Sequence, residues 1–120
     1  MRELVLDTET TGLDPNNGDR LVEIGCVELL NHIPTGRSFH AYINPERPMS
    51  AEAEAVHGLN DAFLADKPVF DAIADDFLAF SREAMLVIHN AAFDVGFLNM
   101  ELGRSGRPLI AREDVFDTLA

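Results

Sequence analysis

Two acidic residues, Asp7 and Glu9, follow the short apolar run Leu4-Val5-Leu6. In a β-strand, side chains two positions apart lie on the same face, so both carboxylates would point into the same space. Carboxylates at the edge of a core repel each other and resist desolvation, and a divalent cation relieves both costs. Taken alone, the pair fits two merely solvated acids at a strand edge better, because short motifs have many chance matches, and only the features downstream favour a metal site.

A third acid, Asp94, lies in the segment His89-Asn90-Ala91-Ala92-Phe93-Asp94. This segment leaves a predicted strand and enters a predicted helix, a crossing where ligands commonly bind. Asp94 falls in the first helical turn, which favours its ionised form, although a simple capping acid would occupy the same place. If the strand before His89 lies parallel to the first strand and beside it, we predict that Asp7, Glu9 and Asp94 converge on one carboxylate cluster.

The composition is that of one globular domain. Of 120 residues, 47% are hydrophobic and 25% are charged, and no apolar run approaches the ~18 residues of a membrane span. We therefore expect no membrane partner. The single Cys26 reads as a buried thiol in a reducing compartment, which favours a cytoplasmic location. The net charge of −12 disfavours direct binding of nucleic-acid phosphates, unless metals held by the acids bridge to them.

The elements that must position these acids follow from the hydrophobic periodicity. An antiparallel meander of three strands is predicted first, followed by helices that alternate with two further strands, so the fold class is α/β with a mixed sheet covered by helices. Ser50 is the predicted N-cap of the first helix and Gly58 its end, while Gly103 is the predicted C-cap of the last helix. The predicted strands are 3–9, 21–30, 38–43, 85–88 and 110–116, and the predicted helices are 51–56, 68–80 and 92–102.

Two motifs resemble those of the DEDD family of 3′–5′ exonucleases, namely LVLDTETTGLD at residues 4–14 and VIHNAAFDVGFL at residues 87–98. The segments RLVEIGCVEL and AEAEAVHGLNDAFLADKPVF between them are similar to intervening regions of the same family. Within that family, the chain closely resembles the exonuclease domain of epsilon, or proofreading, subunits of bacterial DNA polymerase III. The resemblance covers essentially all 120 residues.

The resemblance implies a ribonuclease H-like fold with a mixed five-stranded sheet flanked by helices. It also implies metal-dependent removal of 3′-terminal nucleotides from DNA in replication proofreading. Asp7, Glu9 and Asp94 would be the catalytic acids and the ligands of two Mg²⁺ or Mn²⁺ ions, a chemistry that needs hard oxygen ligands.

By the same resemblance, the substrate is a single-stranded or frayed DNA 3′ end. The protein partners would be the DNA polymerase III alpha subunit and possibly a small accessory subunit. The resemblance places eight residues in contact with the substrate: Asp7, Glu9, Thr10, Thr11, Gly12, Leu13, Glu52 and His57. His89 and Asn90 are expected to hold the loop under the site rather than to react.

One part of the family pattern does not occur in residues 1–120. The third motif, a histidine followed five residues later by an aspartate, has no match, because all four histidines lie before residue 90. We therefore expect residues 1–120 to be the N-terminal portion of the domain, weak or inactive alone and with an apolar surface left uncovered. Two alternatives remain open: an RNA-trimming member of the family, and a non-catalytic remnant that binds metal or nucleotide.

Overall fold

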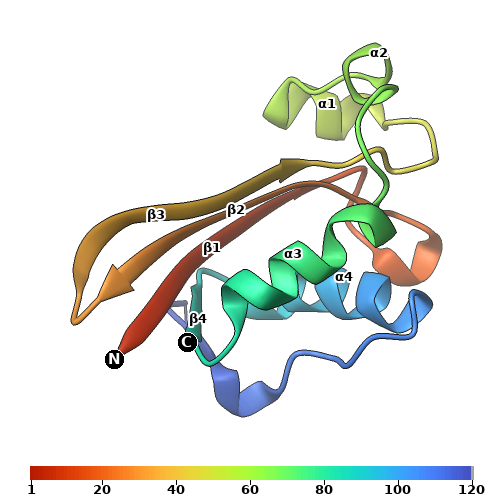
Figure 1. The fold of residues 1–120 in the computed structure, drawn as a ribbon. Helices are drawn as coiled ribbons and strands as arrows, with labels where there is room; N and C mark the ends of the chain where they lie inside the picture. Colours follow the sequence, from red (N-terminus) through yellow and green to blue (C-terminus); the bar gives the residue numbers. More distant parts are fainter. Residues whose placement is uncertain (120) are drawn as a thin grey trace.

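Five strands form one mixed sheet, in the order β3-β2-β1-β4-β5, in the computed structural model (Figure 1). The structure describes residues 1–119, so Ala120 of the predicted domain lies outside the described residues. β1 (Arg2–Thr10), β2 (Leu21–Leu30) and β3 (Ile33–Tyr42) form an antiparallel meander, as predicted. β4 (Met85–Ile88) runs parallel to β1, and β5 (Val115–Asp117) runs parallel to β4. The first and fourth strands are therefore parallel neighbours, the condition on which the predicted meeting of the acids depended.

Two long helices, α3 (Phe70–Ser81) and α4 (Ala91–Arg104), pack on one face of the sheet (Figure 1). The short helices α1 (Ala51–His57) and α2 (Asp61–Leu64) stand at one end of the sheet, and two 3₁₀ turns are η1 (Pro15–Asn17) and η2 (Arg112–Asp114). The core lies between the sheet and α3 and α4, where alternate side chains of β1 and β2 meet the inward faces of both helices. Among residues 1–119, no helix is long and apolar enough to cross a membrane.

Several predicted boundaries were wrong for local physical reasons. β3 begins at Ile33 rather than at residue 38, because Asn31 and His32 both adopt positive φ (52° and 68°) and close a two-residue hairpin directly. β5 covers only Val115–Asp117 rather than 110–116, since the preceding residues form a loop and η2. The backbone N–H of Ile110 in that loop donates to the Asn99 side chain at 2.8 Å instead of to a strand.

The helix ends show a similar mixture of outcomes. Ser50 caps α1 by accepting from the Ala53 N–H at 3.1 Å, and Gly58 ends it with a φ of 74°, both as predicted. α3 begins at Phe70 rather than at residue 68, and the four-residue α2 was not predicted. The C-cap of α4 is Ser105, and the predicted cap at Gly103 was wrong because the helix continues to Arg104.

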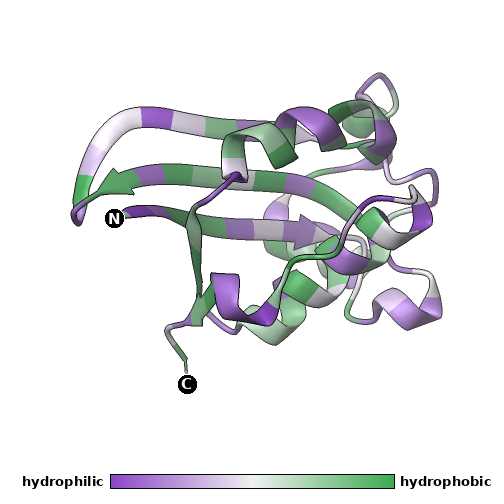
Figure 2. Ribbon diagram, turned by 60° about the horizontal axis from the view of Figure 1, so that its bottom comes forward, coloured by the Kyte–Doolittle hydropathy of each residue, from purple (hydrophilic) through white to green (hydrophobic). Residues whose placement is uncertain are grey.

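The sheet face opposite α3 and α4 carries the predicted uncovered apolar surface. Val27, Val5, Val87 and Phe116 occupy matching register positions on four adjacent strands, so they form one row across the sheet. Three of them are well exposed: Val5 by 44%, Val27 by 49% and Phe116 by 57%. Burial alternates along β1, so apolar Val5 is exposed between buried Leu4 and Leu6, and Figure 2 shows the apolar stretches that run through the strands.

Candidate functional site

The end of β1 turns its two acids to the uncovered face of the sheet. Leu4, Leu6 and Thr8 are buried toward the helices, whereas Asp7 is exposed and Glu9 is partly exposed. The pairing of β1 with β2 places Asp7 opposite Gly25 and Glu9 opposite Glu23. A hollow of about 170 Å³ lies between these four residues and Thr8. The i, i+2 spacing therefore brings Asp7 and Glu9 to one face, as the sequence predicted.

Asp94 approaches the same strand from the opposite face. It lies in the first turn of α4, is only 5% exposed, and accepts a hydrogen bond from the Thr8 hydroxyl. The start of α4 is held by Asp117 of β5, whose carboxylate accepts from the backbone N–H groups of Asn90 and Ala91 at 3.0 Å each. The start of α4 is thus held from another strand, and the role of His89 and Asn90 in holding the loop stays a prediction.

The charges of these acids influence one another. Burial raises the pKa of Glu9, and the negative charges of Asp7, Glu23 and Asp94 raise it further. Burial also raises the pKa of Asp94, with a further increase from Asp7, while the hydrogen bond from Thr8 lowers it. Each carboxylate therefore makes ionisation of its neighbours more costly, and a bound cation would relieve that cost.

The predicted single cluster of three carboxylates is not formed. Among residues 1–119, no three His, Cys, Asp or Glu side chains stand close enough together to hold a metal ion. The reason is local, because the Asp94 carboxylate binds the hydroxyl of Thr8 on the helix side of β1, while Asp7 and Glu9 point to the other side. The donor chemistry of these acids suits a hard cation, and their role as ligands stays a prediction.

A cavity of about 570 Å³ adjoins the end of β1 and gathers most of the predicted substrate residues. Its walls come from the end of β1, the following loop, α1 and the start of α4. The wall residues that the sequence predicted are Glu9, Thr10, Gly12, Leu13, Glu52 and His57. Its volume is within the ordinary range for small-molecule sites.

Thr11 is one of two predicted substrate residues that do not line this cavity. It is 1% exposed, and its carbonyl accepts from the Ser50 hydroxyl at 2.8 Å while its own hydroxyl donates to Asp19 at 2.9 Å. Asp7 also lies outside the cavity, in the adjoining hollow. Thr11 therefore supports the wall from behind rather than facing a ligand.

His57 lines the cavity with both ring nitrogens already bonded to the protein. Its Nε2 lies 3.0 Å from the carbonyl oxygen of Thr10, which can only accept, so Nε2 must carry the proton. Its Nδ1 then accepts from the backbone N–H of Leu59 at 3.0 Å. The neutral Nε2–H tautomer is thus specified by its surroundings, and the ring fixes the distance between α1 and β1.

Sequence reasoning missed several residues of this site. Glu23 faces Glu9 only because of the strand register, and Phe93, Ser50 and Asp19 reach the cavity from separate segments. The alternation of β2 would have placed Glu23 on the same face as Gly25. Nothing in the sequence gave the register that sets Glu23 beside Glu9.

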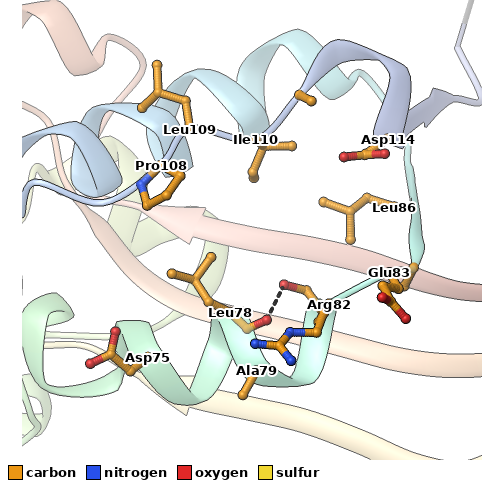
Figure 3. A pocket seen from close by; sticks show the side chains of 13 residues that line it. Asp75, Leu78, Ala79, Arg82, Glu83, Leu86, Pro108, Leu109, Ile110 and Asp114 are labelled. Carbon is orange, nitrogen blue, oxygen red and sulfur yellow. Dashed lines mark hydrogen bonds between the residues drawn. The ribbon is translucent and has the colours of Figure 1, made fainter.

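A second large cavity, of about 500 Å³, lies away from these acids. It opens between the end of α3, the start of β4 and the segment 108–114 (Figure 3). Its floor is largely apolar, with Leu78, Leu86 and Ile110 pointing inward, and Asp75 and Asp114 lie on its sides. None of the predicted site residues lines it.

Comparison with known proteins places this geometry in a family. The family model described as exonuclease (RNase_T) matches residues 4–120. The chain is 54% identical to the DNA polymerase III subunit epsilon of Rickettsia conorii over 122 aligned positions, which are 99% of this chain and 53% of the relative. It is 50% identical to the same subunit of Escherichia coli (strain K12), over 83% of this chain and 43% of the relative. The chain therefore spans about half the length of these relatives.

Solved structures agree on the fold. The metal-free complex of E. coli exonuclease I with single-stranded DNA superposes with a TM-score of 0.86 at 18% identity, over 98% of this chain and 28% of that one. Exonuclease X in complex with 5′ overhanging duplex DNA superposes with a TM-score of 0.61 at 29% identity, over 91% of this chain and 54% of that one. The predicted ribonuclease H-like exonuclease fold is confirmed.

Proposed function

The chain belongs to the RNase_T family of exonucleases, and we propose that it is the N-terminal portion of a 3′–5′ DNA exonuclease domain that proofreads as the epsilon subunit of DNA polymerase III. One observation carries the proposal. The cavity of about 570 Å³ at the end of β1 joins residues from four separate segments beside the acids Asp7 and Glu9. A site for a nucleotide next to paired carboxylates is what hydrolysis of a terminal phosphodiester requires.

The walls of the cavity suit a terminal nucleotide. Leu13 and Val56, which are 85% and 81% exposed, stand at the cavity on opposite segments and offer apolar contact to a base. The Glu52 carboxylate offers polar contact to a sugar, whereas the Thr10 hydroxyl already donates to the Gly12 carbonyl at 2.6 Å and can only accept. Aromatic Phe93, from the first turn of α4, adds a further apolar surface for stacking.

We propose that Asp7, Glu9 and Asp94 hold two divalent cations, Mg²⁺ or Mn²⁺, which would supply positive charge to the scissile phosphate and activate water. Burial raises the pKa of both Glu9 and Asp94, and the neighbouring negative charges add to it, so a cation bound beside them would offset both costs, which supports this assignment. Asp94 would have to exchange or share its hydrogen bond from Thr8 to join the other two acids. His57 is not the general base of the proposal, since both its nitrogens are engaged.

The proposed partners follow from the same role. The substrate is a single-stranded or frayed DNA 3′ end, and the alpha subunit of DNA polymerase III and a small accessory subunit would hold the enzyme at the replication site. A cytoplasmic location goes with that role. A net charge of −12 supports the dependence on cations and on partners, because the surface itself does not attract DNA.

The test is digestion of a 5′-labelled DNA oligonucleotide in Mg²⁺ or Mn²⁺. We compare residues 1–120, an extended form that carries the third motif, and Asp7→Ala in each. The extended form should shorten DNA from its 3′ end, and residues 1–120 should be slower by about 10²–10⁴-fold, the usual contribution of a positioned general base. No trimming by the extended form, or trimming that survives Asp7→Ala, would refute the proposal.

The same assay separates the alternatives. Matched DNA and RNA strands distinguish a proofreading enzyme from an RNA-trimming one, which would degrade RNA faster. A non-catalytic nucleotide-binding role is the second candidate, because no three-ligand metal group exists among residues 1–119. That candidate requires that the extended form bind thymidine 5′-monophosphate with Mn²⁺ yet leave the oligonucleotide intact.

A further inference from the structure

A second buried carboxylate, that of Glu101, lies on the same helix as Asp94. Glu101 is 3% exposed and accepts from Arg20 through both Nε at 2.8 Å and Nη2 at 2.6 Å. The backbone N–H of Leu21 is a third donor at 3.3 Å. Seven residues separate Glu101 from Asp94, so the two acids lie two turns apart on the buried face of α4. The pair therefore ties the helix of Asp94 to the start of β2.

Arg20 extends this tie to the loop that forms the cavity wall. The Arg20 backbone makes two hydrogen bonds with Thr11. The Thr11 N–H donates to the Arg20 carbonyl at 2.9 Å, and the Arg20 N–H donates to the Thr11 hydroxyl at 3.1 Å. The Thr11 carbonyl accepts from the Ser50 hydroxyl, which caps α1. One chain of contacts thus runs from α4 through Glu101, Arg20, Thr11 and Ser50 to α1.

This chain of contacts joins the cavity walls that the strands do not connect. Phe93 stands on α4, Gly12 and Leu13 on the loop, and Glu52 on α1. A buried ion pair contributes little net stability compared with a well-packed apolar pair, because both charges lose their hydration. A bidentate Arg–carboxylate pair does fix both the distance and the relative orientation of the two elements that it joins.

Resting on the proposed nucleotide site, we propose that Glu101 and Arg20 are positioning residues that set the loop 11–20 and α1 at the spacing from α4 that a nucleotide requires. They touch no ligand themselves. Without the pair, the core could still pack around apolar side chains, but the loop and α1 would no longer be held at a fixed distance from α4. The pair therefore sets the affinity for the terminal nucleotide rather than the stability of the fold.

The test replaces the pair as a unit, with Arg20→Met and Glu101→Leu in one variant, so that no buried charge is left alone. A matched control replaces a second buried pair, with Arg2→Met and Glu28→Leu. Glu28 is 4% exposed and accepts from Arg2, but its partner on β1 is Leu4, at the end of the strand opposite the site. The single variant Glu101→Gln, of equal size, covers the case in which the double variant does not fold.

Three properties are measured on each chain: the midpoint of thermal unfolding, the Kd for thymidine 5′-monophosphate with Mn²⁺, and amide hydrogen exchange. We expect the Arg20/Glu101 variant to unfold within a few degrees of the unmodified chain, to bind the nucleotide at least tenfold more weakly, and to exchange the Thr11 and Ala53 amides faster. The Arg2/Glu28 control should keep both the affinity and those exchange rates. Glu101→Gln should show the same direction of change with a smaller loss of affinity.

Unchanged affinity and unchanged exchange in a folded Arg20/Glu101 variant would overturn the inference. An equal loss of affinity in the Arg2/Glu28 control would also overturn it, because the effect would then be general destabilisation. If the unmodified chain does not bind the nucleotide, the proposed function fails. The exchange rates of Thr11 and Ala53 still decide whether the pair holds the loop and α1.

Discussion

Replacement of Gly12 by alanine should disrupt the cavity wall through one neighbour, Asp19. A Cβ built on Gly12 would lie only 2.6 Å from the Cγ of Asp19, so the carboxylate must move. That carboxylate accepts from the Thr11 hydroxyl at 2.9 Å and from the Asp14 N–H at 3.2 Å, and it pairs with Arg47 at 3.4 Å. Moving it breaks two hydrogen bonds of the loop.

The cost can be worked from these contacts. Each intramolecular hydrogen bond contributes about 1 kcal/mol net, so Gly12→Ala should lower the free energy of unfolding by about 2 kcal/mol. The half-exposed pair with Arg47 adds little. For a domain of this size, the unfolding midpoint should then fall by about 8 °C. Urea denaturation followed by circular dichroism measures the change in the free energy of unfolding directly.

A glycine on the neighbouring strand supplies the control. A Cβ at Gly25 would meet nothing within 4 Å, so Gly25→Ala should be neutral or stabilise by up to about 1 kcal/mol. The double variant Gly12→Ala with Asp19→Ala should be no less stable than Asp19→Ala alone, since the clashing carboxylate is gone. Equal stability of the Gly12 variant and the unmodified chain, or strictly additive losses in the double variant, would refute the reasoning.

Three further predictions concern other parts of the chain. Asp94→Asn should stabilise the metal-free chain at pH 7, because burial raises the pKa of Asp94 and the folded state therefore disfavours its charge. The gain in the free energy of unfolding should vanish as the pH falls toward 4, where Asp94 is protonated. Urea denaturation at several pH values measures this gain, and a gain that does not depend on pH would contradict the prediction. Cys26, 1% exposed and with a pKa raised by burial to about 12, should resist a disulfide reagent at pH 8 until urea is added, and rapid labelling of the folded chain would disprove it. The uncovered row with Val5 and Phe116 should bind a hydrophobic dye and cause association that increases with protein concentration in sedimentation. Phe116→Ser should reduce both effects. A chain that stays monomeric and binds no dye would contradict the prediction.

Local residue patterns were enough to predict much of this protein. The alternation of β1 placed Asp7 and Glu9 on one face, and the caps Ser50 and Gly58 defined α1 at both ends. These features depend on a few adjacent residues, whose backbone geometry and hydrogen bonds are set by their own side chains. The mixed sheet followed from the change of hydrophobic period near residue 50, because each period suits only one kind of element.

The errors had two different causes. The segment 108–114 lacks strand pairing, since the Ile110 N–H bonds to the Asn99 side chain of α4, a residue whose distance from Ile110 is set only after the chain has folded. The error at Gly103 is local, because Ser105, two residues later, ends α4 by donating to carbonyls of the last turn.

The site itself divides in the same way. The identities of the three acids and of the cavity residues Thr10, Gly12 and His57 could be predicted from motifs within short segments. The register that sets Glu23 beside Glu9, the turn of Asp94 toward Thr8, and the Glu101–Arg20 pair that joins α4 to the cavity wall could not. Register, side-chain direction and ion pairing depend on how strands and helices meet, and those energies exist only once the elements are packed together.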